Sequence, residues 1–319
     1  MSFDPAKQLQ RIWPWIPAFR VVAETEHLPT AAARLHVSAS ALSRSVKLVE
    51  ETLGEELFVR GSRRITLNAA GQRLLEAVRR SMTGLEHAMH GVLARDFAGE
   101  YRLSSLGVLT DYFVLPALLE LQRETPGVIP CMTTLGSKEA NQRLTNGQIE
   151  VAFYYDATSM AGIECRHIGA LTNSLYCGRG HPLFGHKSVA LRELQRHEFS
   201  VAGIGDRGTP MDGWPVEVPR KVGFQILMLS TNLAVARSGR FVCVLPDVVA
   251  HADVMGGRLH RLAPRPVPDT SVYAACRAED AQASFTSEVI ARVERALAAP
   301  LRDPPGAEAP KPRRRASRR

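Results

Sequence analysis

Ten side chains between positions 30 and 64 have the types and spacing that binding to a nucleic acid requires. Serines occupy positions 38, 40 and 43, and an arginine and a lysine follow within about one helical turn. On a helix this order brings short hydroxyls to base edges and cations to phosphates. The residues that we expect to contact DNA are Thr30, Ser38, Ala39, Ser40, Ser43, Arg44, Lys47, Arg60, Arg63 and Arg64.

A small helical unit must position these side chains. Phe19, Val22 and Ala23 recur at helical spacing and predict a first helix with one apolar face. Pro29 fits the first turn of a second helix, where its missing N–H costs nothing. A tight turn follows, and Ser38 is a suitable N-cap for a third helix.

The third helix carries its own apolar stripe, because Leu42, Val46 and Val49 fall at i, i+4 and i+7. A hydrophobic plug at Leu57 and Phe58 comes next, and a basic hairpin over residues 60–67 follows it. The alternative is an amphipathic helical pair with a solvated charged face. The complete series of elements favours a helix-turn-helix with a wing that contacts the DNA backbone.

The segment resembles the winged helix-turn-helix of the LysR-type transcriptional regulators. The positions that carry the resemblance are Ala31-Ala32, Leu35, Val37-Ser38, Ala41-Leu42-Ser43-Arg44, Leu53-Gly54, Leu57-Phe58, Arg60 and Ala70-Gly71. The chain departs from the family at Pro29, where Ser or Thr is usual, and at Ala39-Ser40, where a glutamine followed by Pro or Ser is usual. The family's base preference therefore does not transfer to this chain.

A long helix is predicted from Asn68 to about residue 95, since its apolar residues alternate at steps of three and four. Such a seam either packs on its own domain or pairs with a second chain, and the family resemblance favours the second. The expected dimerisation residues are Leu75, Val78, Met82, Leu85, Met89 and Val92.

Beyond Gly99 short strands alternate with helices, which predicts an α/β region with parallel sheets. Weak motifs in family order, such as Gly180-His181-Pro182-Leu183, extend the resemblance over about residues 18–298. The resemblance implies a two-lobed regulatory domain similar to periplasmic binding proteins. The expected organisation is a DNA-binding domain (1–67), a linker helix (68–97), lobe I (98–165 and 267–301), lobe II (166–266) and a disordered basic tail (302–319).

A small-molecule effector is expected in the cleft, because ligands of open α/β sheets bind beyond the carboxyl ends of strands. Each candidate hydroxyl has an equally plausible role as an ordinary helix cap. The residues predicted to bind the effector are Leu109, Thr110, Ser137, Ala202, Gly203, Ser230 and Thr231.

Composition limits the remaining classes of function. The net charge is +8, but the tail alone holds seven Lys/Arg and two Asp/Glu. The tail either attracts phosphates non-specifically or is a solvated extension. The five cysteines are scattered and odd in number, which favours reduced thiols over a redox pair.

The N-terminal residues lack the apolar run of a signal peptide, so a cytoplasmic protein without a membrane span is expected. Motifs of phosphate loops, zinc proteases and serine hydrolases are missing, so we expect no enzyme, cofactor or metal. The alternatives are an enzyme fused to a DNA-binding module and a solute-binding transport component. The expected partners are promoter DNA, an effector of unknown identity, and further copies of the chain as a homodimer or homotetramer.

Overall fold

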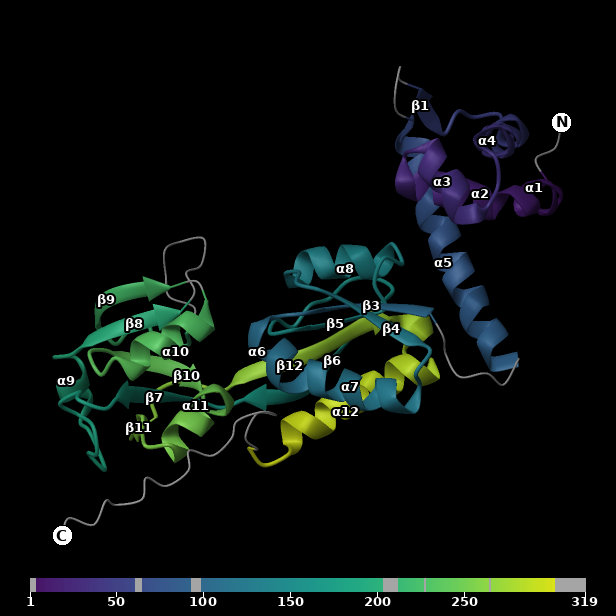
Figure 1. Cartoon of the computed structure of the whole chain (residues 1–319). Coiled ribbons are helices and arrows are strands. Elements are labelled where there is room, and N and C mark those ends of the chain that lie inside the picture. The colour runs from purple at the N-terminus through teal and green to yellow at the C-terminus, as the bar shows by residue number, and fades with distance from the viewer. Residues whose placement is uncertain are drawn as a thin grey trace, which may run out of the picture. The chain divides into compact units, whose positions relative to one another are not determined.

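The computed structural model of the chain describes residues 4–60, 65–92, 99–202, 212–226, 228–263 and 265–301. They form two compact units, and each is described by itself. The elements of the first unit (Figure 1) are α1 (Pro5–Ile12), the 3-10 turn η1 (Trp13–Trp15), α2 (Ile16–Thr25), α3 (Leu28–Leu35), α4 (Ala39–Leu53), β1 (Phe58–Arg60), β2 (Ile65–Leu67) and α5 (Ala69–Val92).

The first unit confirms the predicted sequence of helix, turn, helix and hairpin. Pro29 lies in the first turn of α3, and Ser38 caps α4 by accepting a hydrogen bond from the Ala41 N–H at 3.2 Å. His36 ends α3 in the left-handed conformation, with φ of 54°. β1 and β2 pair antiparallel, and together they form the base of the predicted wing.

One hydrophobic core holds this unit together. It contains the predicted stripe of α4 together with Phe19 and Val22 of α2, all exposed by at most 2%. Phe58 packs edge-on against Phe19, with ring centroids 5.8 Å apart. Ile12 of α1 and Ile16 of α2 also belong to the core, so the helix that precedes the predicted unit is part of it.

The predicted seam of α5 has two different environments. Leu75 and Val78 are buried in the core of their own unit, and Met82 packs against it. Leu85 and Met89, two turns further along, are 45% and 52% exposed. The first half of the seam therefore packs on its own domain, and only the second half is available to a partner.

The second unit contains two sheets, which we call lobe I and lobe II (Figure 1). The sheet of lobe I has the order β4-β3-β5-β12-β6, with bounds β3 (Gly99–Ser105), β4 (Val128–Thr133), β5 (Val151–Tyr154), β6 (Ile163–Leu171) and β12 (Thr270–Arg277). Its helical segments are α6 (Gly107–Leu109), the π-helix η2 (Thr110–Val114), α7 (Leu115–Glu124), α8 (Ser137–Thr145), η3 (Ala278–Asp280) and α12 (Ser284–Ala298).

Lobe II is built in the same way. Its sheet has the order β11-β7-β10-β8-β9, with bounds β7 (Asn173–Gly178), β8 (Glu198–Ala202), β9 (Lys221–Ile226), β10 (Val242–Pro246) and β11 (Leu259–Leu262). Its helices are α9 (Leu191–Leu194), α10 (Leu229–Arg237) and α11 (Asp247–Met255).

The prediction of purely parallel sheets is wrong. β3 pairs parallel with β4 and β5, and β8 pairs parallel with β9 and β10. However, β12 is antiparallel to β5 and β6, and β7 is antiparallel to β10 and β11. The antiparallel pairs arise because the chain passes between the lobes twice, near Leu171–Asn173 and near Pro268–Thr270, and each passage adds a strand to both sheets.

The structure also differs from the sequence prediction at the boundary between the two lobes and at strand β9. β6 continues the sheet of lobe I to Leu171, so the boundary between the lobes lies later than the expected residue 165. Strand β9 ends at Ile226, and α10 begins three residues later at Leu229. The β9 sequence KVGFQI alternates polar or glycine residues with apolar ones, which is the pattern that identifies a strand in a sequence.

All five cysteines are free thiols. Cys177 and Cys243 lie on neighbouring strands but pack in different hydrophobic clusters of lobe II, which places them on opposite faces of the sheet. None of the helices within the described ranges is both long and apolar enough to span a membrane.

Candidate functional site

The exposed face of α4 is the candidate DNA-binding surface. Ser38, Ala39 and Ser40 lie at its N-terminal end and are exposed, and the Ser38 and Ser40 hydroxyl oxygens are 3.0 Å apart. Arg44 and Lys47 follow on the exposed surface, while Ser43 is half-buried. The helix thus buries one apolar stripe and presents small polar groups followed by cations, as a helix in the major groove requires.

Lys47 is only weakly engaged within the protein. Its Nζ lies 3.5 Å from Glu51 Oε1, and both side chains are more than half exposed. Exposed i, i+4 ion pairs contribute a few tenths of a kcal/mol. Lys47 can therefore exchange Glu51 for a phosphate at little cost.

Glu50, near the C-terminal end of α4, fixes the start of the wing. Its Oε1 accepts hydrogen bonds from the backbone N–H groups of Leu57 at 2.9 Å and Phe58 at 3.3 Å. Glu26 does the same for the second strand, because its Oε1 accepts from the Leu67 N–H at 2.9 Å. The hairpin is therefore held at both strands by carboxylates of the helical core.

The remaining predicted DNA contacts lie beside this surface. Thr30 is exposed on α3, and its hydroxyl lies 2.7 Å from His27 Nδ1. Arg60 ends β1 at the point where the wing loop begins. Arg63 and Arg64 lie outside the described residues.

A linked set of contacts docks α5 on the helical core. Asn68 Oδ1 accepts from the Gly71 N–H at 2.8 Å, and Asn68 Nδ2 donates to the Glu56 carbonyl at 2.6 Å. Glu24 of α2 accepts from Arg79 at 3.0 Å and from Arg20 at 3.3 Å. Burial raises the pKa of Glu24, but the two arginines outweigh it and the net shift is downward. The first part of α5 is thus held rigidly against the helical core of the first unit.

Lobe I and lobe II together line a cleft pocket of about 170 Å³. Its polar groups come from Tyr155, Asn173, Asp212 and Thr270. Asn173 Nδ2 donates to Thr270 Oγ1 at 2.8 Å and to the Pro268 carbonyl at 3.1 Å, which ties the two passages between the lobes together. The apolar lining is Val108, Leu171, Leu229, Val244 and Pro246.

The carboxylate in the cleft pocket is already paired. Both oxygens of Asp212 accept from Arg220, at 2.7 and 2.8 Å, and both side chains are nearly buried. The Arg220 guanidinium stacks on Phe199 and Trp214, 5.5 and 5.3 Å from the ring centroids. Burial raises the pKa of Tyr155 to about 12, so its hydroxyl stays protonated at neutral pH. The pocket can therefore offer neutral hydrogen-bonding groups around an apolar volume.

None of the predicted effector residues in the described ranges lines this pocket, but some directly follow residues that do. Leu109 and Thr110 follow its lining residue Val108, and the Thr110 Oγ1 is buried without a hydrogen-bond partner. Ser230 and Thr231 follow Leu229 in the first turn of α10. Ser137 begins α8 and donates to Asp156 at 3.1 Å, and Ala202 ends β8. Gly203 lies outside the described residues.

Sequence reasoning missed the polar residues of the cleft pocket. Asn173 and Thr270 lie where the chain passes from one sheet to the other, and these passages are not visible in an alternation of strands and helices. One signal in the sequence is that short apolar runs, at residues 174–177 and 271–276, begin directly after them. Within the described ranges, no group of three His, Cys, Asp or Glu side chains is arranged as metal ligands.

Comparison with protein families matches nearly the whole chain. Residues 13–72 match the bacterial regulatory helix-turn-helix proteins of the lysR family, and residues 94–298 match the LysR substrate binding domain. The HTH-type transcriptional regulator IlvY of Escherichia coli (strain K12) is 31% identical over 140 residues, or 43% of this chain and 47% of IlvY. The match thus spans about half the length of that relative.

Two solved structures share the fold. A full-length OxyR variant from Pseudomonas aeruginosa has a TM-score of 0.66 at 19% identity, covering 93% of this chain and 98% of OxyR. LysG from Corynebacterium glutamicum, solved with bound effector Arg, has a TM-score of 0.61 at 17% identity, covering 89% of this chain and 97% of LysG.

Proposed function

The chain belongs to the LysR family of bacterial regulatory helix-turn-helix proteins, and from this premise we propose that it is a transcriptional regulator that binds promoter DNA and responds to a small-molecule effector. The exposed face of α4, which carries small polar groups and then cations, is the observation that supports DNA binding most strongly. We place the protein in the cytoplasm, where such DNA is accessible.

The DNA-binding proposal assigns different roles to neighbouring residues of α4. Ser38, Ala39 and Ser40 contact base edges, and Arg44 and Lys47 contact the flanking phosphates. Base preference differs from that of relatives with a glutamine at position 39, because an alanine methyl can contact thymine but cannot form a bidentate pair with adenine.

The test is a fluorescence anisotropy titration of the full chain on a mixed-sequence duplex at several salt concentrations. We expect affinity to fall as salt rises, and Lys47→Ala to reduce the slope of log K against log salt by about one. Lys138→Ala, an exposed lysine of α8, is the matched control and leaves the slope unchanged. Identical slopes for the wild type and Lys47→Ala would remove the assigned phosphate contact.

The cleft pocket is the proposed effector site, and the hydroxyls beside it support that assignment. Thr110, with its buried unpartnered oxygen, is the best candidate of the first lobe, and we retain Leu109, Ser137, Ala202, Gly203, Ser230 and Thr231 as proposed contacts. Ser137→Ala should weaken the response to effector while leaving DNA binding intact. Loss of both activities, or of neither, would contradict that placement.

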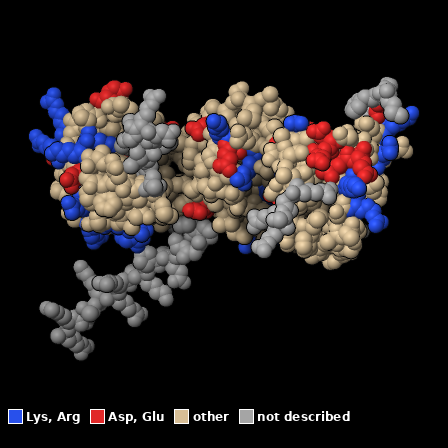
Figure 2. All heavy atoms as spheres, turned by 90° about the horizontal axis from the view of Figure 1, so that it is seen from above, with Lys and Arg blue, Asp and Glu red and all other residues tan. Residues whose placement is uncertain are grey.

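We propose a homodimer built through the exposed half of α5, at Leu85 and Met89, and a homotetramer completed by the regulatory domains. The charge of the two lobes supports the second contact. Residues 99–171 and 270–301 hold eight Lys/Arg and twelve Asp/Glu, whereas residues 172–269 hold twelve Lys/Arg and eight Asp/Glu. Lysines and arginines gather over lobe II, at the left of Figure 2. Opposite net charges favour packing of lobe I of one copy against lobe II of another.

A further inference from the structure

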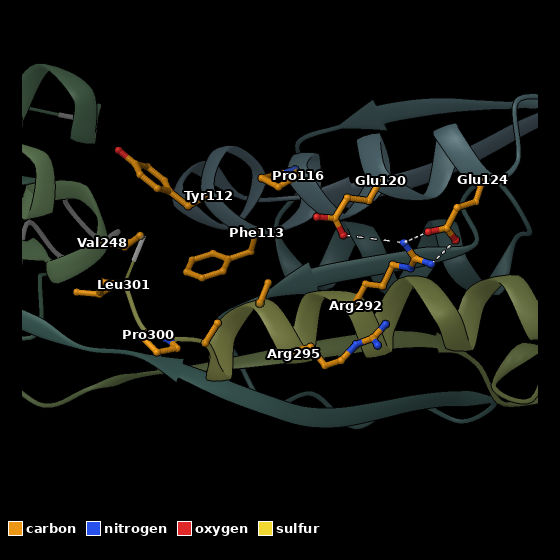
Figure 3. A pocket seen from close by; sticks show the side chains of 12 residues that line it. Tyr112, Phe113, Pro116, Glu120, Glu124, Val248, Arg292, Arg295, Pro300 and Leu301 are labelled. Carbon is orange, nitrogen blue, oxygen red and sulfur yellow. Dashed lines mark hydrogen bonds and ion pairs between the residues drawn. The ribbon is translucent and has the colours of Figure 1, made fainter. Parts of the chain in front are cut away.

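A second pocket of about 550 Å³ lies apart from the cleft pocket (Figure 3). Tyr112 and Phe113 of η2, Glu120 of α7 and Arg295 of α12 line it, together with Val248 of α11 and Leu301. Because α11 belongs to lobe II and the other elements to lobe I, an occupant of this pocket touches both lobes. It shares no lining residue with the cleft pocket.

One end of the second pocket is charged. Arg292 lies at its centre: Nη1 lies 3.1 Å from Glu124 Oε1, Nη2 also bonds to Glu124, and Nε bonds to Glu288 at 2.7 Å. Both oxygens of Glu124 and most donors of Arg292 are therefore engaged. These two residues form a fixed wall with no charge left to recognise a ligand.

Two charged groups at the same end remain available. Among the described contacts, the Glu120 carboxylate has only a 3.9 Å approach to Arg292, and its side chain is 67% exposed. Arg295 Nη2 donates to Glu288 Oε1 at 3.2 Å, and most of the five N–H donors of Arg295 have no described partner. Glu120 and Arg295 come from two different helices and lie at one end of the pocket in Figure 3.

The other end is apolar. The Phe113 ring points into the middle of the pocket in Figure 3, and Val248 and Leu301 lie beyond it. Phe113 and Val248 are 7% and 8% exposed, so they form a preorganised surface rather than a mobile one. A pocket with a carboxylate and a guanidinium at one end and an apolar floor selects a ligand with matching parts.

We propose that the second pocket binds a zwitterionic amino acid with an apolar side chain. Glu120 accepts hydrogen bonds from its ammonium group, Arg295 donates to its carboxylate, and Phe113 and Val248 contact its side chain. Because the ligand bridges the lobes, it stabilises one arrangement of lobe I relative to lobe II. The second pocket is thus a regulatory site that is independent of the cleft pocket.

The experiment is isothermal titration calorimetry of the full chain with three probes of one shape. L-Phenylalanine carries both charges, 2-phenylethylamine keeps only the ammonium, and 3-phenylpropionate keeps only the carboxylate. We expect L-phenylalanine to bind at least about tenfold more tightly than either single-charge probe. Each of those probes lacks one charged group, and the side chain that would pair with that group is left unpaired.

Variants assign the binding to this pocket. Glu120→Gln should reduce the affinity for L-phenylalanine to about that for 3-phenylpropionate, and Arg295→Gln to about that for 2-phenylethylamine. Ala296→Trp fills the pocket without changing charge and should abolish binding. Exposed residues of lobe II supply the matched controls Glu217→Gln and Arg192→Gln, which should bind as the wild type does.

Three results would overturn the proposal. They are absence of heat with L-phenylalanine at millimolar concentration, equal affinity for the three probes, and unchanged binding in Ala296→Trp. None of them bears on DNA binding, which the anisotropy titration measures separately.

Discussion

Glu150 shows how burial changes the chemistry of a single residue. It is 4% exposed at the start of β5, and its Oε2 accepts from the Arg102 N–H at 2.6 Å. Burial raises its pKa to about 7, although the hydrogen bond and the charges of Arg102 and Arg277 act in the opposite direction. Hydrophobic periodicity marks position 150 only as the residue before a strand, so neither the burial nor the shift was predictable from the sequence.

The raised pKa of Glu150 makes the stability of lobe I depend on pH. A carboxyl group with a folded pKa above its unfolded value binds its proton more tightly in the folded state, so stability is full below about pH 4.5 and falls as pH rises to about 7. Glu150→Gln keeps an acceptor for the Arg102 N–H and removes the titration. We expect its free energy of unfolding to exceed that of the wild type at pH 8 by up to about 3 kcal/mol, and to match it near pH 4, where the carboxyl is protonated in both states.

Circular dichroism melting of both proteins at the two pH values checks this expectation. Glu100→Gln changes an exposed carboxylate on neighbouring β3 and is the matched control. An equal difference between Glu150→Gln and the wild type at both pH values would show that Glu150 does not titrate in this range.

At the scale of elements, the sequence predicted the features that depend on local patterns, namely helix faces, caps and short strands. The stripe of α4, the Ser38 cap and the strands of the wing follow from periodicity and capping, and all are confirmed. The order of strands in the lobes and the polar lining of the cleft pocket depend on where the chain changes sheets. A change of sheet brings together residues about one hundred positions apart, such as Asn173 and Thr270. No local pattern in the sequence encodes such a contact.

The seam of α5 shows the same limit within one helix. A heptad pattern says that one face is apolar, but it does not say what covers that face. Leu75 and Val78 are covered by their own unit, because Gly71 lets α5 approach the wing closely. A Cβ at Gly71 would lie 2.1 Å from the Leu57 carbonyl oxygen and 2.6 Å from Leu67 Cδ2.

Gly71→Ala should therefore move α5 away from the wing and destabilise the first unit by about 1–3 kcal/mol. Urea denaturation followed by tryptophan fluorescence measures this loss, because Trp13 and Trp15 lie in that unit. Gly136→Ala is the matched control, since nothing lies within 4 Å of a Cβ there. Equal stability of the Gly71→Ala variant and the wild type would show that α5 does not need this close approach.

At the scale of the whole molecule, binding to two half-sites requires a dimer. Leu85→Glu combined with Met89→Glu puts two carboxylates on the exposed half of the α5 seam, and we expect the dimer dissociation constant to rise at least tenfold. Sedimentation velocity of the full chain measures the change. Arg73→Glu and Ala77→Glu place the same charge at exposed positions of the same helix and should leave the oligomeric state as it is. An unchanged dimer in the double variant would place the interface elsewhere.

We propose that the basic tail is a second, non-specific source of DNA affinity, with a solvated extension as the alternative. It holds seven of the forty Lys and Arg residues, so its deletion separates attraction to phosphate from contacts made by α4. Contacts of α4 remain after the deletion, because the helix belongs to a unit with its own core.

Selection of bound duplexes from a random pool is the sharpest test of sequence-specific DNA binding by α4. The full chain should enrich a sequence with two half-sites related by two-fold symmetry, because a dimer presents two copies of α4. Ala39→Leu combined with Ser40→Ala changes two exposed residues assigned to base edges, and this variant should lose that enrichment while retaining its fold and its oligomeric state. A pool that is not enriched by the wild type, or one that is enriched equally by the double variant, would contradict the assignment of α4 as the element that binds specific DNA.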